Sequence, residues 1–165
     1  MKHSLPAAIA AAIAIAVAAS LAASAHDYTF GDLVIIHPHA PATAPGAPTG
    51  AGYLTISNEG AAADRLLAVS AVFAAGAKIH RTTMKNDIMR MRPVEGGLEL
   101  PAGDIVELEP GGYHIMFTGL EGPLADGERR SVTLTFERAG TVEIEFHVET
   151  DAGAGAGGAH DGHGR

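Results

Sequence analysis

The sequence of 165 residues contains no cysteine. Without a thiol the protein can form no disulfide, and it cannot perform thiol–disulfide exchange, cysteine catalysis or iron–sulfur ligation. A blue-copper electron-transfer site needs a thiolate ligand and is excluded as well. No residue of this sequence can carry the lipid anchor that is attached to an amino-terminal cysteine. Stability must therefore come from a buried core, which a single domain of this length can supply.

Basic side chains are also scarce. Lysine and arginine together number 11 against 19 aspartates and glutamates, and the formal net charge is −8. An acidic chain of this kind is not expected to bind nucleic acid.

The first segment, 1–25, differs in composition from the rest. Lys2 precedes an uncharged run rich in alanine that ends in a small-x-small pattern at residues 23–25. This pattern predicts a cleaved signal peptide and a periplasmic location. The alternative is an uncleaved membrane anchor, but the run is short and no stop-transfer charges follow it. The mature domain is then expected to span residues 26–150.

The last segment, 151–165, is rich in glycine and alanine and has too little apolar content to pack against a core. We expect a flexible tail that is disordered without metal. Its two histidines, His160 and His163, form a candidate Cu(II) site, because imidazoles on a flexible chain tolerate tetragonal geometry. The alternative is a solubilising end with incidental histidines.

The residues between these segments predict an all-β domain, since no stretch shows a helical apolar stripe. In the clearest strands Val132, Leu134 and Phe136 alternate with Ser/Thr, and apolar residues of 142–148 alternate with Glu and His. The proline-rich segment 41–48 is expected to be a surface loop. Short strands separated by turn signals favour a single Greek-key sandwich or barrel. The earlier candidate strands are 28–37, 51–58, 65–70, 77–82, 88–94, 104–108 and 113–118.

The methionines are clustered in the sequence together with two histidines. Apart from Met1, the methionines are Met84, Met89, Met91 and Met116, and His80 and His114 lie in nearly the same window. Thioether sulfur is a soft, neutral ligand that favours Cu(I) over Zn(II), Mg(II) or Ca(II), and imidazole binds copper in either oxidation state. A mixed set of histidine and methionine therefore indicates copper.

Strand spacing places these candidates on common faces. Residues i and i+2 of a strand project from the same face, so His114 and Met116 should point together. Met89 and Met91 should likewise share a face, with Arg90 on the opposite one. The alternative is that the methionines fill the core and the histidines are surface residues. Spacing alone leaves both interpretations open.

The motif His80-x10-Met91-x22-His114-x-Met116 resembles the signature of the PCuAC family of periplasmic copper chaperones. The spacing between Met91 and His114 is one residue longer than in the pattern of that family. The resemblance extends over nearly the whole mature domain and includes Ala51-Gly52-Tyr53-Leu54, Met91-Arg92-Pro93-Val94 and Leu108-Glu109-Pro110-Gly111-Gly112-Tyr113.

The resemblance implies a cupredoxin-like β-sandwich that binds Cu(I) through His80, Met91, His114 and Met116. It further implies delivery of copper toward the CuA-bearing subunit of cytochrome oxidase, together with Sco-type proteins. We expect a monomeric binding protein without catalytic turnover. Met89 or Met84 is a candidate secondary sulfur ligand. Four basic residues are candidates for steering an acidic recipient, or are simply a solvated face: Arg81, Lys85, Arg90 and Arg92.

Three further hypotheses remain open. His37 and His39 are either two exposed histidines near a strand end or a second metal site. Proteins of the PCuAC family often carry a tryptophan and an arginine near these positions. His26 at a cleaved amino terminus would allow a Cu(II) chelate like that of copper oxygenases, with His37, His39 or His147 offered as the second histidine. A metal-free structural β-sandwich is the third alternative, and it requires the His/Met cluster to be buried packing.

Overall fold

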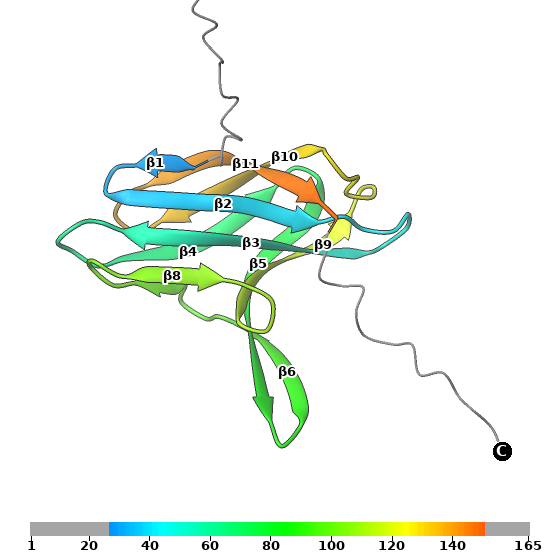
Figure 1. Ribbon diagram of the computed structural model, residues 1–165, viewed down its shortest axis with the longest axis horizontal. Coiled ribbons are helices and arrows are strands. Elements are labelled where there is room, and N and C mark those ends of the chain that lie inside the picture. The colour runs from blue at the N-terminus through cyan, green and yellow to red at the C-terminus, as the bar shows by residue number, and fades with distance from the viewer. Residues whose placement is uncertain (1–26, 151–165) are drawn as a thin grey trace, which may run out of the picture.

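The computed structural model describes residues 27–150, which form eleven β-strands and no helix (Figure 1). The strands are β1 (Tyr28–Phe30), β2 (Leu33–Pro41), β3 (Thr49–Asn58), β4 (Asp64–Ala71), β5 (Ala74–Lys85), β6 (Ile88–Pro93), β7 (Leu98–Leu100), β8 (Ile105–Leu108), β9 (Tyr113–Leu120), β10 (Arg129–Phe136) and β11 (Thr141–Glu149). The all-β prediction is confirmed. Within the described range no helix is long and apolar enough to cross a membrane.

The strands form one hydrogen-bonded sheet that curls back on itself. Its order is β6-β5-β9-β8-β3-β2-β11-β10-β4-β7, with β1 added to β2 and a further pairing between β9 and β3. Phe117 of β9 and Phe146 of β11 meet edge to face, with ring centroids 6.2 Å apart, although β9 and β11 are not neighbours in the sheet. The two halves of the sheet therefore pack on a shared core, in agreement with the expected sandwich.

Close packing of these rings explains a glycine in the middle of β3. A Cβ atom on Gly52 would lie 2.8 Å from Phe117 and 2.9 Å from Phe146. Such distances are too short for carbon atoms in contact, so only glycine lets the backbone approach both rings.

The expected strands are present, with local differences. The candidate at 28–37 is two strands, because the chain turns at Gly31, whose φ is +62°. The expected loop occupies residues 42–48, and β2 extends as far as Pro41. Strand β7 was not predicted, and β5 continues three residues beyond the expected end at residue 82.

The β5–β6 hairpin extends beyond the body of the sheet (Figure 1). Its two strands pair from His80↔Pro93 to Lys85↔Ile88. The connecting residues, Asn86 and Asp87, have φ values of 53° and 58°. Two positive φ values in a two-residue loop are the conformation that matches the twist of a tight hairpin. The hairpin thus presents the methionine-rich segment outside the core.

Asp64 joins the start of β4 to the connection between β10 and β11. Its carboxylate accepts backbone N–H bonds from Arg65 at 2.7 Å, Arg138 at 2.8 Å and Ala139 at 2.9 Å. Burial raises the pKa of the Asp64 carboxyl, but these donors and the charge of Arg138 outweigh burial and hold the pKa below the usual aspartate value. The ionised carboxylate therefore stabilises the folded state.

Replacement of Asp64 by alanine is expected to lower the free energy of unfolding at pH 7 by about 2–3 kcal/mol, because three donors lose a charged acceptor. The contribution should be complete above the unfolded pKa of about 3.9 and should be lost as the pH falls through the lower folded pKa. Urea denaturation at several pH values measures this. The exposed Asp104→Ala variant is the control, and equal losses in both variants would contradict the role of Asp64.

Candidate metal centre

Two histidines face each other across neighbouring strands. The antiparallel pairing of β5 with β9 places His80 directly opposite His114. Their rings are nearly parallel, with centroids 5.9 Å apart and 20° between their planes. Residues that are directly opposite in an antiparallel pair project from the same face of the sheet. Two imidazoles are therefore brought together from segments distant in the sequence.

Two methionines lie beside this histidine pair. Met91 is opposite Thr82, which is two residues along β5 from His80 and so on the same face. Met116 is two residues along β9 from His114 and pairs with Ala51 of β3. A pocket of about 400 Å³ is lined by Met89, Met91, His114 and Met116, together with residues of β2, β3 and the 110–111 turn.

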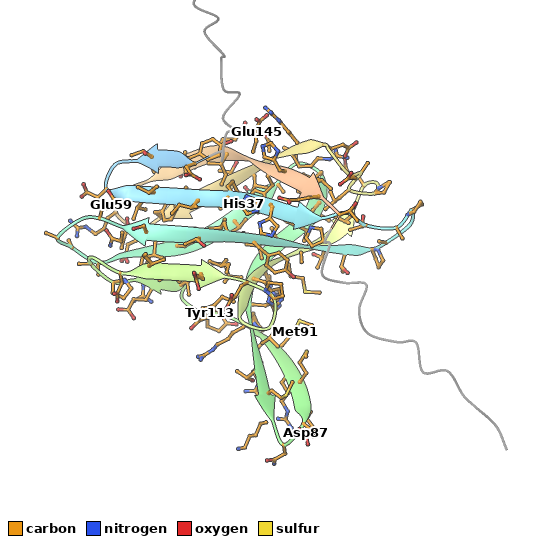
Figure 2. All side chains as sticks on the ribbon, in the orientation of Figure 1. His37, Glu59, Asp87, Met91, Tyr113 and Glu145 are labelled. Carbon is orange, nitrogen blue, oxygen red and sulfur yellow. The ribbon has the colours of Figure 1, made fainter. Side chains whose placement is uncertain are left out.

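His80 is not among the residues that line this pocket, and it adjoins the pocket through its ring contact with His114. Figure 2 shows Met91 where the hairpin meets the body of the protein and Asp87 at the hairpin tip. The two candidate faces predicted from i, i+2 spacing thus meet at a single pocket.

The two imidazoles have similar backbone partners. His80 Nδ1 lies 3.4 Å from the carbonyl oxygen of Lys78, and His114 Nδ1 lies 3.4 Å from that of Gly112. When Nδ1–H donates to such a carbonyl, the lone pair is on Nε2, where it can bind a metal. Burial lowers the pKa of the His114 imidazole, the Gly112 carbonyl raises it and the charge of His80 lowers it, with a net value below the usual one. Neutral imidazole is the form that binds metals.

Exposure argues against the core-filling interpretation of the hairpin methionines. Met84, Met89 and Met91 are 67%, 58% and 56% exposed. On β9 the side chains that enter the core are Ile115 and Phe117, both fully buried. That interpretation is therefore wrong for these three methionines.

The structure describes two of the other candidate histidines. His26, His160 and His163 lie outside the described residues. His37 and His39 lie on β2, and Glu149 lies beside them, a carboxylate that sequence reasoning did not connect with them. No local sequence signal could have found this contact, because it depends on the pairing of β2 with β11.

Comparison with known proteins shows the family to which the chain belongs. The family described as "Putative lipoprotein LpqE-like" matches residues 33–148. The chain belongs to the LpqE-like family. A relative of this LpqE-like chain, "Putative lipoprotein Lxx21020" of Leifsonia xyli subsp. xyli (strain CTCB07), is 32% identical over 111 residues, which are 67% of each protein.

Solved structures similar to this LpqE-like domain are PCuAC domains. The "Copper-bound PCuAC domain from PmoF2" is 27% identical with a TM-score of 0.65, and the match covers 76% of this chain and 98% of that one. The "Apo PCuAC domain from PmoF1" is 29% identical with a TM-score of 0.65, covering 76% and 99%. The solution structure of apo-DR1885 from Deinococcus radiodurans shares the fold. It is 23% identical with a TM-score of 0.58, and the match covers 92% of this chain and 98% of that one.

The LpqE-like chain thus has the PCuAC fold, as its resemblance to that family implied. The descriptions of these relatives are those of a lipoprotein family and of copper-domain proteins, in agreement with the expected binding protein. The LpqE-like sequence contains no cysteine, the residue to which the lipid of a lipoprotein is attached.

In the metal-free protein, the His114 imidazole is expected to titrate below the usual histidine pKa of about 6.5, because its surroundings disfavour the cation. NMR of the ring protons against pH measures the midpoint. Replacing His80 with glutamine removes one neighbouring charge and should raise that midpoint. A midpoint at or above the usual value in the unaltered protein would contradict the burial described here.

Proposed function

We propose that this protein is an exported copper chaperone that holds one Cu(I) ion with His80, Met91, His114 and Met116 and passes it to a recipient protein. The observation that carries the proposal is the convergence of two imidazoles and two thioethers on one face of β5, β6 and β9.

The donor set suits the reduced ion. All four donors are neutral when the imidazoles are unprotonated, so the site brings no negative charge to compensate Cu(II). Two soft sulfur ligands favour Cu(I), and thioethers cannot be lost to disulfide formation in an oxidising compartment. A site open on the hairpin side lets a second protein approach the ion, which release to a recipient requires.

The relatives support both parts of the proposal. One PCuAC domain of 27% identity is described as copper-bound, and it aligns with 76% of this chain. The lipoprotein descriptions of the family and of the Leifsonia relative support export to the cell envelope. The candidate signal peptide at 1–25 agrees with export.

The hairpin offers a path for copper transfer. Met84 and Met89 are directly opposite each other near the tip, and Met89 also lines the pocket that contains Met91. Exposed thioethers at these positions can contact copper as it arrives or leaves. We propose the CuA-bearing oxidase subunit and Sco-type proteins as recipients, as the family resemblance implies.

The opposite face of the hairpin is basic. Arg81 is opposite Arg92, Thr83 is opposite Arg90, and the guanidinium of Arg81 lies 5.3 Å from the centroid of the Tyr113 ring. On an acidic protein, this local positive charge would attract an acidic recipient to the hairpin that carries the methionines.

The ligand assignment is tested by Met91→Leu and Met116→Leu, which keep side-chain volume and remove sulfur. Each is expected to lower Cu(I) affinity by more than about tenfold, the effect that loss of even an outer-shell partner can have. His80→Ala and His114→Ala should do the same. An anaerobic competition titration against a chromophoric Cu(I) chelator measures the affinity.

The matched control is Ile88→Leu, which changes an exposed apolar side chain of the same hairpin outside the proposed sulfur ligands. It should leave the affinity unchanged. Unaltered Cu(I) affinity in both the Met91 and Met116 variants would contradict the proposal. Failure of the unaltered protein to compete with the chelator for Cu(I) would contradict it as well.

The docking role of the basic face is tested by the double variant Arg90→Glu, Arg92→Glu. Transfer of Cu(I) to a CuA-domain acceptor should slow by about tenfold at low salt and lose most of its salt dependence, while Cu(I) affinity stays the same. Stopped-flow absorbance of the acceptor measures the rate. If neither the rate nor its salt dependence changes, these arginines are only a solvated face.

A further inference from the structure

A backbone irregularity in β2 marks a second cluster of metal-binding side chains. The pairing of β2 with β3 shifts register between Ile36 and His39, which is a β-bulge. His37 within it has a φ of 48°, a left-handed conformation that a non-glycine residue adopts at a cost in free energy. Bulges turn a side chain away from its regular direction and are common beside functional sites.

The bulge brings His37 against its neighbour and against another strand. The rings of His37 and His39 have centroids 4.4 Å apart. Strand β11 runs parallel to β2 with His39 opposite His147 and Pro41 opposite Glu149. As a result, His37 Nε2 lies 3.3 Å from Glu149 Oε1. One ligand atom from each of His37, His39 and Glu149 lies within 4.8 Å of the other two. Figure 2 shows His37 on β2, well away from Met91 on the hairpin.

We propose that His37, His39 and Glu149 form a second metal site for a divalent cation of the borderline class, Cu(II) or Zn(II). Two imidazoles and one carboxylate are the ligand set of open zinc sites, where water completes the coordination. Cu(II) binds such nitrogen and oxygen ligands more tightly than Zn(II) does. Ligand atoms about 2.1 Å from a tetrahedral ion are about 3.4 Å apart, so only small side-chain rotations are needed.

The backbone already orients one of these ligands. His39 Nδ1 lies 3.0 Å from the carbonyl oxygen of His37. A proton on Nδ1 that is donated to this oxygen leaves Nε2 free to bind an ion, which is the usual outer-shell arrangement of a metal-bound histidine. Asp126 lines a pocket of about 380 Å³ together with His37 and Glu149, and a second carboxylate adds negative potential for a divalent cation.

An ion pair without metal is the simplest alternative. The His37 and Glu149 side chains are 58% and 44% exposed, and exposed ion pairs contribute little stability. Such a pair accounts for one distance, but it gives no reason for the position of the His39 ring or for a strained residue in β2. The second site also contains no sulfur and contains a negative charge, so it should prefer the ions that the methionine site disfavours.

The experiment is a Cu(II) titration of the full protein, followed by EPR and by competition with a Cu(II) chelator, with Zn(II) as a competing ion. One equivalent with nitrogen hyperfine coupling is expected. His37→Ala, His39→Ala and Glu149→Gln should each weaken this equivalent by more than about tenfold. Each variant should retain its affinity for Cu(I), so the outcome does not depend on the methionine site.

Controls separate this site from other histidines and carboxylates. Glu145→Gln removes a half-exposed carboxylate from the same strand, and it should leave Cu(II) affinity unchanged. The His26→Ala variant tests the amino-terminal chelate, and the double variant His160→Ala, His163→Ala tests the tail. The bound equivalent of Cu(II) should persist in both. Loss of the equivalent only in those variants, or its persistence in the His37→Ala, His39→Ala double variant, overturns the proposal.

Discussion

The antiparallel pairing of β5 with β9 places His80 opposite His114, and the arrangement of the proposed copper site depends on this register. A shift of one residue would turn every side chain of one strand to the other face. The core prevents the shift, because Ile79 and Ile115 are opposite each other on the buried face. Each buried side chain of this size contributes about 1.5–3 kcal/mol. The apolar face of these strands thus fixes the geometry of the polar face, before any metal binds.

The hairpin beyond this pairing has little support of its own. Every residue of β6 is exposed, and an isolated two-stranded hairpin is marginally stable in water. It is held by its cross-strand pairs, by the turn at Asn86 and Asp87, and by the continuation of β5 into the sheet. Exposed apolar thioethers add nothing to folding, so ligand chemistry explains them better than packing does. An ion bound between Met91 and the β9 ligands would join the hairpin to the body and stabilise it by linkage.

Local patterns predicted much of the fold and named the residues that the fold brings together at the proposed copper site. The alternation of Val132 and Leu134 with polar residues predicted β10 correctly, because one face of this strand is buried in the core and the other is more exposed. The pairing of His80 with His114 is a tertiary contact that no spacing rule gives, and only the family resemblance implied it. The Asn86-Asp87 turn was missed because it contains no glycine. Strand β7 was missed because three residues are too few to show an alternation of apolar and polar side chains.

The same reasoning explains why Glu149 was not anticipated. His37 and Glu149 meet because β2 and β11 run parallel, and parallel pairing joins segments that no short turn connects. Strand β3 then lies between the two candidate sites: Tyr53 packs 5.5 Å from the His39 ring, and Ala51 is opposite Met116. One site has neutral, sulfur-containing donors and the other has a carboxylate and no sulfur. Each donor set disfavours the ion that suits the other, so the two proposed sites would let a chain without a single thiol distinguish two metal states on one sheet.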